Sequence, residues 1–137
     1  MLKERATYYY IEENKNCAVA MFQAANDVYG LGLTEDTAAL FTGFGGGMGY
    51  GITCGALSGA IGAIGAKYKG MDRETSHALC TGLVEKFKEK LACGSVDCSV
   101  IAAQYKVPET RCLKAVLLGA EALEEFIAEW EAKECAK

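Results

Sequence analysis

Several patterns that would point to a particular chemistry are missing from this sequence. It has one histidine, His77, in 137 residues. A Ser/His/Asp or Cys/His catalytic centre would therefore depend on that single imidazole. No C-x-x-C pair occurs, although zinc sites usually draw their thiolates from tight local pairs, and no C-x-x-C-H motif for covalent haem occurs either. A four-thiolate site built from distant segments stays open, because local spacing cannot reveal it.

Basic charge is also scarce. The formal net charge is −4, and no cluster of Lys and Arg stands out. Because phosphate binding needs a basic face, nucleic acid is excluded as the expected partner. The first residues are charged and lack the apolar stretch of a secretory signal, so we expect a cytoplasmic location.

A membrane span is not expected, although residues 37–66 carry no charge. A spanning helix needs about 20 mostly apolar residues. Six glycines between Gly43 and Gly51 interrupt this run in the middle. The remaining helical part is rich in Gly and Ala and is more typical of a buried, closely packed helix in a protein without membrane insertion.

Runs of alternating β-branched residues are absent, so strands are not predicted. We predict an all-α fold, a single domain over residues 1–137, with about five to six helices in a compact bundle. The helical patterns cover residues 2–13, 17–29, 34–42, 53–69, 72–93, 96–105 and, from Pro108 as first residue, 108–134.

The Gly/Ala-rich segment is predicted to be the central helix. Gly51, Gly55 and Gly59 are spaced four apart, which places small residues on one nearly flat face. Each interior glycine costs about 1 kcal/mol of helix stability relative to alanine, so tight burial must offset the loss. This face and the aromatic residues Tyr8–Tyr10 could serve a homodimer as well as a core.

The glycine-rich loop Gly43–Gly51 does not match a phosphate-binding motif. No Lys-Ser/Thr follows it, no register gives G-x-G-x-x-G and no strand precedes it. We expect a turn with unusual backbone angles that passes close to neighbouring helices, or to a sulfur site or ligand. In the second case, the candidate contact positions are Gly45, Gly46, Gly47 and Gly49.

Cysteine is the abundant reactive residue, with seven copies. An odd number in a reducing compartment fits poorly with a structural disulfide framework, so metal binding or redox chemistry is favoured. Cys17, Cys54 and Cys98 fall where helices are expected to begin, and the field of a helix N-terminus favours thiolate over thiol. Cys80, Cys93 and Cys135 are better explained as filler of the core or chain end.

Five segments together resemble a known family. They are Asn16-Cys17-Ala18, the loop from Gly43 to Gly49, Cys54-Gly-Ala-Leu-Ser-Gly59, Gly94-Ser-Val-Asp-Cys98, and Cys112. The chain resembles the C_GCAxxG_C_C family of small helical proteins, over about residues 5–125. The family label describes its members as redox-active. The resemblance implies that Cys17, Cys54, Cys98 and Cys112 are the four functional cysteines, and it names no substrate.

Two mechanisms follow from this hypothesis. In the first, pairs of thiols cycle with disulfides, and Cys54 is the expected attacking thiolate because it combines a helix start with the adjacent glycine loop. In the second, the four thiolates hold an iron–sulfur cluster for electron transfer, and backbone N–H groups of the loop tune its potential. Both need a redox partner that the sequence does not identify. A third hypothesis is a non-catalytic interaction domain whose cysteines only fill the core.

Overall fold

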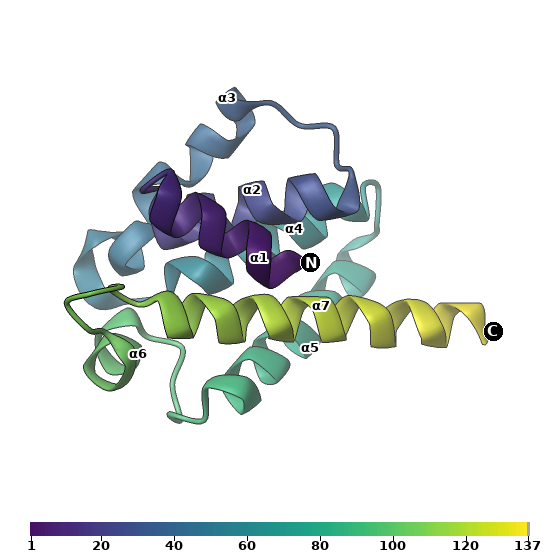
Figure 1. Ribbon diagram of the computed structural model, residues 1–137. Helices are drawn as coiled ribbons and strands as arrows, with labels where there is room; N and C mark the ends of the chain where they lie inside the picture. The colour runs from purple at the N-terminus through teal and green to yellow at the C-terminus, as the bar shows by residue number, and fades with distance from the viewer. Residues whose placement is uncertain (137) are drawn as a thin grey trace.

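The computed structural model describes residues 1–136, which form seven α-helices, one short 3₁₀-helix, two short π-helices and no strand (Figure 1). The all-α prediction is therefore confirmed. None of the helices in this range has the length and apolar content needed to cross a membrane. The elements are α1 (Leu2–Thr7), η1 (Tyr8–Glu12), α2 (Cys17–Tyr29), α3 (Glu35–Ala38), η2 (Ala39–Phe44), η3 (Gly47–Gly51), α4 (Gly55–Lys67), α5 (Arg73–Leu91), α6 (Cys98–Tyr105) and α7 (Leu113–Cys135).

Capping residues set several of these boundaries where the sequence predicted them. Asn16 precedes α2, and its side-chain oxygen accepts a hydrogen bond from the Val19 N–H at 2.9 Å. Asp72 does the same for α5, accepting from the Thr75 N–H at 2.7 Å. Gly30 ends α2 in a left-handed conformation with φ of 61°. These boundaries were predictable because a cap involves only neighbours in the chain.

The start of the last helix was predicted wrongly. Pro108 is not its first residue, because α7 begins at Leu113. Pro108 instead lies in a turn closed by the Val107 N–H, which donates to the Arg111 carbonyl at 2.9 Å. The turn is possible because Arg111 takes a left-handed φ of 55°. Proline fits the first turn of a helix and a tight turn equally well, so the residue type alone did not separate them.

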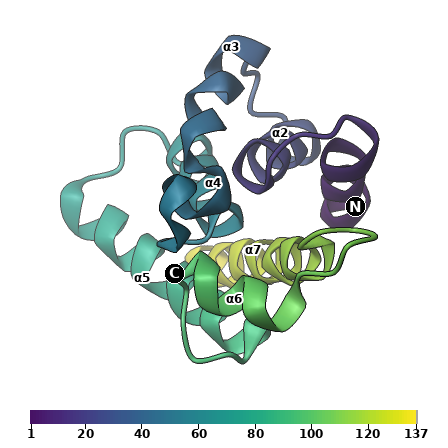
Figure 2. The same cartoon turned by 90° about the vertical axis from the view of Figure 1, so that its left-hand side faces the viewer.

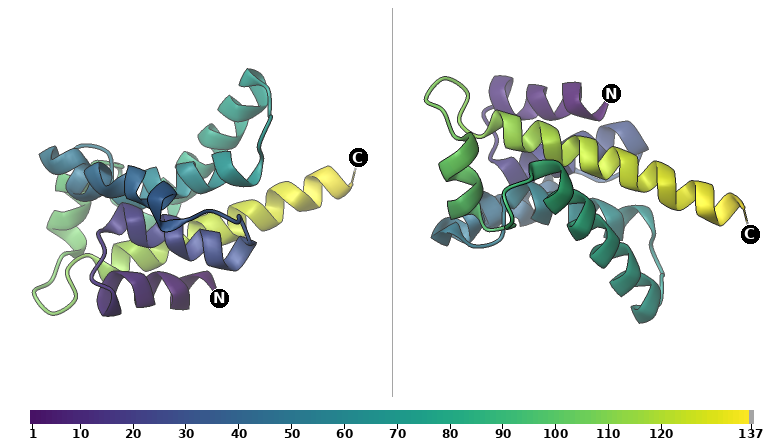
Figure 3. Two further views of the ribbon diagram at one scale, coloured as in Figure 1. Left: turned by 90° about the horizontal axis from the view of Figure 1, so that it is seen from above. Right: turned by 90° about the horizontal axis from the view of Figure 1, so that it is seen from below.

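Helix α4 occupies the middle of the bundle, as predicted. It lies beside α2 and also packs against α5 and α7 (Figures 1 and 2). Ala56, Ala60 and Ile64 are completely buried along it. In the views from above and below, α1 covers the outer side of α2 (Figure 3). Helix α5 diverges from α7 toward the C-terminal end of α7 (Figure 3).

Glycine allows α4 to approach its neighbours closely. A Cβ at Gly59 would collide with the Ala18 carbonyl and lie 3.1 Å from the Met21 Cβ, both on α2. A Cβ at Gly62 would collide with the ring of Phe41 on η2. The small-residue face of α4 is therefore filled by parts of the same chain, and burial offsets the helix propensity lost at each glycine. A homodimer through other surfaces stays a prediction.

Replacing Gly59 by alanine should destabilise the fold by about 1–3 kcal/mol, because the added methyl meets backbone that cannot move aside without separating α4 from α2. The matched control is Gly65→Ala in the same helix, where a Cβ would meet nothing within 4 Å. That control should be neutral or more stable by up to about 1 kcal/mol. Urea unfolding followed by circular dichroism measures both values. Equal stability of the two variants would contradict the close packing.

Candidate functional site

The four cysteines of the motif all lie at the starts of helices. Cys17 and Cys98 are the first residues of α2 and α6. Cys54 and Cys112 directly precede α4 and α7 as their N-cap residues. Helices α2, α4 and α7 begin at the same end of the bundle, where α6 also lies, and Figure 2 looks onto that end. The fold thus gathers four helix N-termini around four thiols.

Two short backbone segments hold Cys54 and Cys98 together. The Cys54 N–H donates to the Val96 carbonyl at 2.8 Å, and the Cys98 N–H donates to the Ile52 carbonyl at 2.5 Å. Between these bonds, Thr53 and Asp97 form an isolated antiparallel bridge. The start of α6 is therefore fixed against the start of α4, although 43 positions separate the two cysteines.

Glycines leave room for the Cys17 sulfur and the Cys98 side chain next to these paired backbone segments. A Cβ at Gly55, the first residue of α4, would collide with the Cys17 Sγ. A Cβ at Gly47 would lie 2.6 Å from the Cys98 Cβ. Only glycine at these two positions leaves room for the thiol-bearing residues, which gives a steric reason for the first glycine of the CGAxxG motif.

The glycine loop has the unusual backbone angles that the sequence predicted. Gly46, Gly47, Met48 and Gly49 all have left-handed φ values of 62–67°. Of the candidate contact positions, Gly47 lies against Cys98, whereas Gly46 and Gly49 have open space where a Cβ would be.

Gly45, at the start of the same loop, lies against the side chain of Asn16. A Cβ there would lie 2.6 Å from the Cγ of Asn16, the residue before Cys17. The Asn16 side chain also donates to the Thr42 carbonyl at 2.9 Å. The loop thus bridges the starts of α2 and α6, and its assignment to a bound cofactor stays a prediction.

Cys112 is anchored to the N-terminal segment. Its backbone N–H donates to the Tyr10 hydroxyl at 3.1 Å. The preceding residue, Arg111, donates from its guanidinium to the Tyr10 carbonyl at 2.5 Å and stacks over the Tyr10 ring, with its Cζ 3.9 Å from the centroid. Tyr10 is 4% exposed. A buried aromatic residue from the start of the chain therefore positions the fourth cysteine.

Burial is the main cause of a raised pKa at Cys54, Cys98 and Cys112, and neighbouring thiols add to it. Cys17 raises the pKa of Cys54, Cys98 and Cys112, and Cys98 raises the pKa of Cys54 and Cys112. Within residues 1–136, however, every cysteine is a free thiol and no pair lies at disulfide distance. That range also contains no group of three His, Cys, Asp or Glu side chains placed to hold a metal ion.

Burial changes the expected order of reactivity. Cys54 is 6% exposed, and loss of hydration raises the pKa of its thiol to about 12. The N–H groups of Leu57 and Ala56 in the first turn of α4 oppose this rise. The sequence-based expectation that the helix field leaves Cys54 as the ready thiolate is therefore wrong, because desolvation outweighs the field of the helix.

Cys98 and Cys112 have a more favourable environment. Burial raises the pKa of both thiols, but both are only half-buried. The Lys106 ammonium opposes the rise at both cysteines, and the Arg111 guanidinium also opposes it at Cys112. Nearby cations favour the thiolate form. Sequence reasoning missed Lys106 and Tyr10, since neither has a motif of its own.

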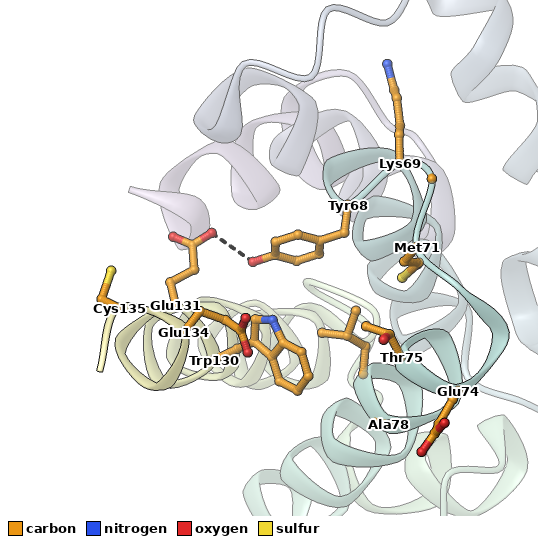
Figure 4. A pocket seen from close by; sticks show the side chains of 12 residues that line it. Tyr68, Lys69, Met71, Glu74, Thr75, Ala78, Trp130, Glu131, Glu134 and Cys135 are labelled. Atoms are coloured by element: carbon orange, nitrogen blue, oxygen red, sulfur yellow. Dashed lines mark hydrogen bonds between the residues drawn. The ribbon is translucent and has the colours of Figure 1, made fainter. Parts of the chain in front are cut away.

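The remaining cysteines, Cys80, Cys93 and Cys135, lie outside the four-cysteine motif. Cys80 and Cys93 are half-buried and Cys135 is exposed. Cys135 borders an open cavity of about 760 Å³ between α5 and the last turns of α7, lined in part by Tyr68, Trp130 and Glu131 (Figure 4). The Tyr68 hydroxyl donates to the Glu131 carboxylate there at 2.8 Å. None of the four motif cysteines lines this cavity, so it is separate from the four-cysteine site.

Comparison with known proteins gives one match. A family described as "Putative redox-active protein (C_GCAxxG_C_C)" matches residues 15–126. This range includes all four cysteines and the glycine loop. Searches of curated proteins and of solved structures find no match to the chain.

Cys54 should be the slowest of the four cysteines to alkylate in the folded protein. Because its pKa is about 12, its thiolate fraction at neutral pH is very small. Its rate should rise about tenfold per pH unit through the range where an ordinary thiol levels off, above a pKa of about 8.5. Iodoacetamide labelling with mass-spectrometric mapping measures each site, and the exposed Cys135 provides the reference for reagent activity. If the alkylation rate of Cys54 stopped rising near the ordinary thiol pKa of about 8.5, the raised pKa of this thiol would be contradicted.

Proposed function

Because the chain belongs to the C_GCAxxG_C_C redox-active family, we propose that it transfers electrons by cycling thiols at its four-cysteine end between reduced and disulfide forms. The observation that supports this proposal is the convergence of Cys17, Cys54, Cys98 and Cys112 at four helix N-termini. Oriented backbone N–H groups and the positive ends of helix dipoles stabilise negative charge on sulfur. Partial exposure of three of the four thiols leaves them accessible to a substrate.

Cys112 is the attacking thiol in this proposal. It combines partial exposure, a helix start and two neighbouring cations, Lys106 and Arg111. Cys98 is the resolving thiol, because it is partly exposed, begins a helix at the same end of the bundle and is close enough to affect the pKa of Cys112. Cys54 is buried, and the Cys17 sulfur lies against Gly55 in the first turn of α4. These two cysteines support the site or accept the disulfide by later exchange.

The chemistry is a two-step exchange. The Cys112 thiolate attacks one sulfur of a substrate disulfide, forms a mixed disulfide and releases one thiolate. The Cys98 thiolate then attacks the Cys112 sulfur, forms an internal disulfide and releases the second thiolate. Two electrons pass from protein to substrate, and a dithiol reductant regenerates the protein.

The second step needs movement. A disulfide requires a sulfur–sulfur distance of about 2.05 Å, and no cysteine pair in residues 1–136 is that close. Cys112 follows the turn Val107–Arg111, most of which is exposed. Movement of Cys112 with this turn breaks the bonds from Arg111 and Cys112 to Tyr10, but it leaves the packing of α4 against α2 in place.

An iron–sulfur cluster is the alternative form of redox activity. Four thiols surrounded by helix N-termini are the donor type that such clusters use. As placed, however, the side chains of residues 1–136 do not fit a metal ion, since no three of them converge on one. We therefore derive no step through a cluster.

Equilibration in glutathione redox buffers should produce one internal disulfide. After trapping with N-ethylmaleimide, the oxidised protein should carry two fewer labels than the reduced protein, and peptide mapping should place the bond between Cys98 and Cys112. The Cys98→Ser variant should stop at the mixed disulfide, because the resolving thiol is missing.

The matched control is Cys93→Ser, which removes a cysteine outside the motif and should leave the internal disulfide unchanged. Persistence of all seven free thiols with slow, equal reactivity would support an interaction domain instead. Iron and acid-labile sulfide in anaerobically purified protein would support the cluster and would contradict thiol cycling as the main activity.

A further inference from the structure

A second cavity lies at the turn that directly precedes Cys112 in the chain. It has a volume of about 470 Å³. Its lining comes from the end of α6 and the turn that follows: Ala102, Lys106, Val107, Pro108 and Arg111. The cavity therefore combines three apolar residues with two cationic side chains, and one of these cations, Arg111, directly precedes Cys112 in the chain.

The two cations differ in how they are held. Arg111 is fixed by its hydrogen bond to the Tyr10 carbonyl and by its stacking on the Tyr10 ring. Lys106 is exposed, and within residues 1–136 no carboxylate forms a salt bridge or hydrogen bond with it. By contrast, Lys67, Lys86 and Lys90 are all paired with glutamates of α7.

Lys106 and Arg111 give this cavity two positive charges, although the net charge of the chain is −4. The acidic residue of the same turn, Glu109, does not line the cavity. An unpaired ammonium beside a fixed guanidinium attracts carboxylates, and the start of α7, directly after Cys112, adds to the positive potential. The site is therefore complementary to a small anion and not to a cation.

We propose that the cavity between Lys106 and Arg111 binds the carboxylate of a small anionic disulfide and so places its sulfur–sulfur bond next to Cys112. This inference rests on the proposed thiol–disulfide function and adds the class of its substrate. Ala102, Val107 and Pro108 contact the aliphatic part of that substrate. Attack by Cys112 forms the mixed disulfide, and the departing thiolate takes the bonding electron pair.

Three disulfides of similar size but different charge test the substrate class. They are dithiodipropionate, which is anionic, bis(hydroxyethyl) disulfide, which is neutral, and cystamine, which is cationic. At a fixed pH and low salt, the reduced protein should react fastest with the anionic compound and slowest with the cationic one. Added salt should remove most of this difference, since it screens exposed charges.

The variant is Lys106→Glu, and the matched control is Lys69→Glu. Lys69 is an exposed lysine beside the cavity at the other end of the bundle, so the control makes the same change in net charge (Figure 4). Lys106→Glu should lower the rate of reaction with the anionic disulfide on the order of tenfold, relative to the rate with the neutral disulfide. Lys69→Glu should leave that ratio close to the wild-type value. Arg111 is not used, because it also anchors Tyr10.

The outcomes separate the two proposals. If the protein reacts with all three disulfides, but at equal rates or slowest with the anion, the substrate class is wrong and thiol cycling stands. An equal effect of Lys106→Glu and Lys69→Glu would also overturn the site, since it would reflect net charge alone. If none of the three disulfides forms a mixed disulfide with the protein, the proposed function itself fails.

Discussion

The close approach of α4 to α2 is the constraint on which the rest of the molecule depends. Two glycines, Gly55 and Gly59, permit it: a Cβ at the first would strike the Cys17 sulfur, and a Cβ at the second would strike the Ala18 carbonyl. Both motif glycines thus allow close contact between α4 and α2, at two successive turns of α4. They bring together the helix starts that carry Cys17 and Cys54, and they fill the centre of the core without a cavity.

Thiol reactivity at this site is a balance between two opposing effects. Helix N-termini favour thiolates, whereas burial disfavours any charge. Burial wins at Cys54, whose pKa rises to about 12. Lys106 and Arg111 oppose burial at Cys112. After burial, negative charge on Cys98 or Cys17 further raises the pKa of Cys112, so ionisation of either neighbour makes ionisation of Cys112 harder. This arrangement suits sequential thiolate chemistry, in which one sulfur acts at a time.

Much of the local structure could be predicted from the sequence, because its causes are local. Asn16, Gly30 and Asp72 mark helix ends through bonds to their near neighbours. The glycine loop was correctly predicted to have unusual backbone angles. The start of α7 was not predicted correctly, because Pro108 suits a helix start and a turn alike, and the left-handed Arg111 that closes the turn is held by Tyr10, about a hundred positions away.

The sequence by itself determined the all-α class, the capped helices and the set of four motif cysteines, since hydrophobic periodicity, capping and a spaced motif are all readable along the chain. Only the tertiary structure decided which thiol is buried, which cations face Cys112 and where an open cavity lies beside it. The physical reason is that hydration and charge at a sulfur depend on every segment packed around it. The segments at this site come from positions as distant as Tyr10 and Cys112.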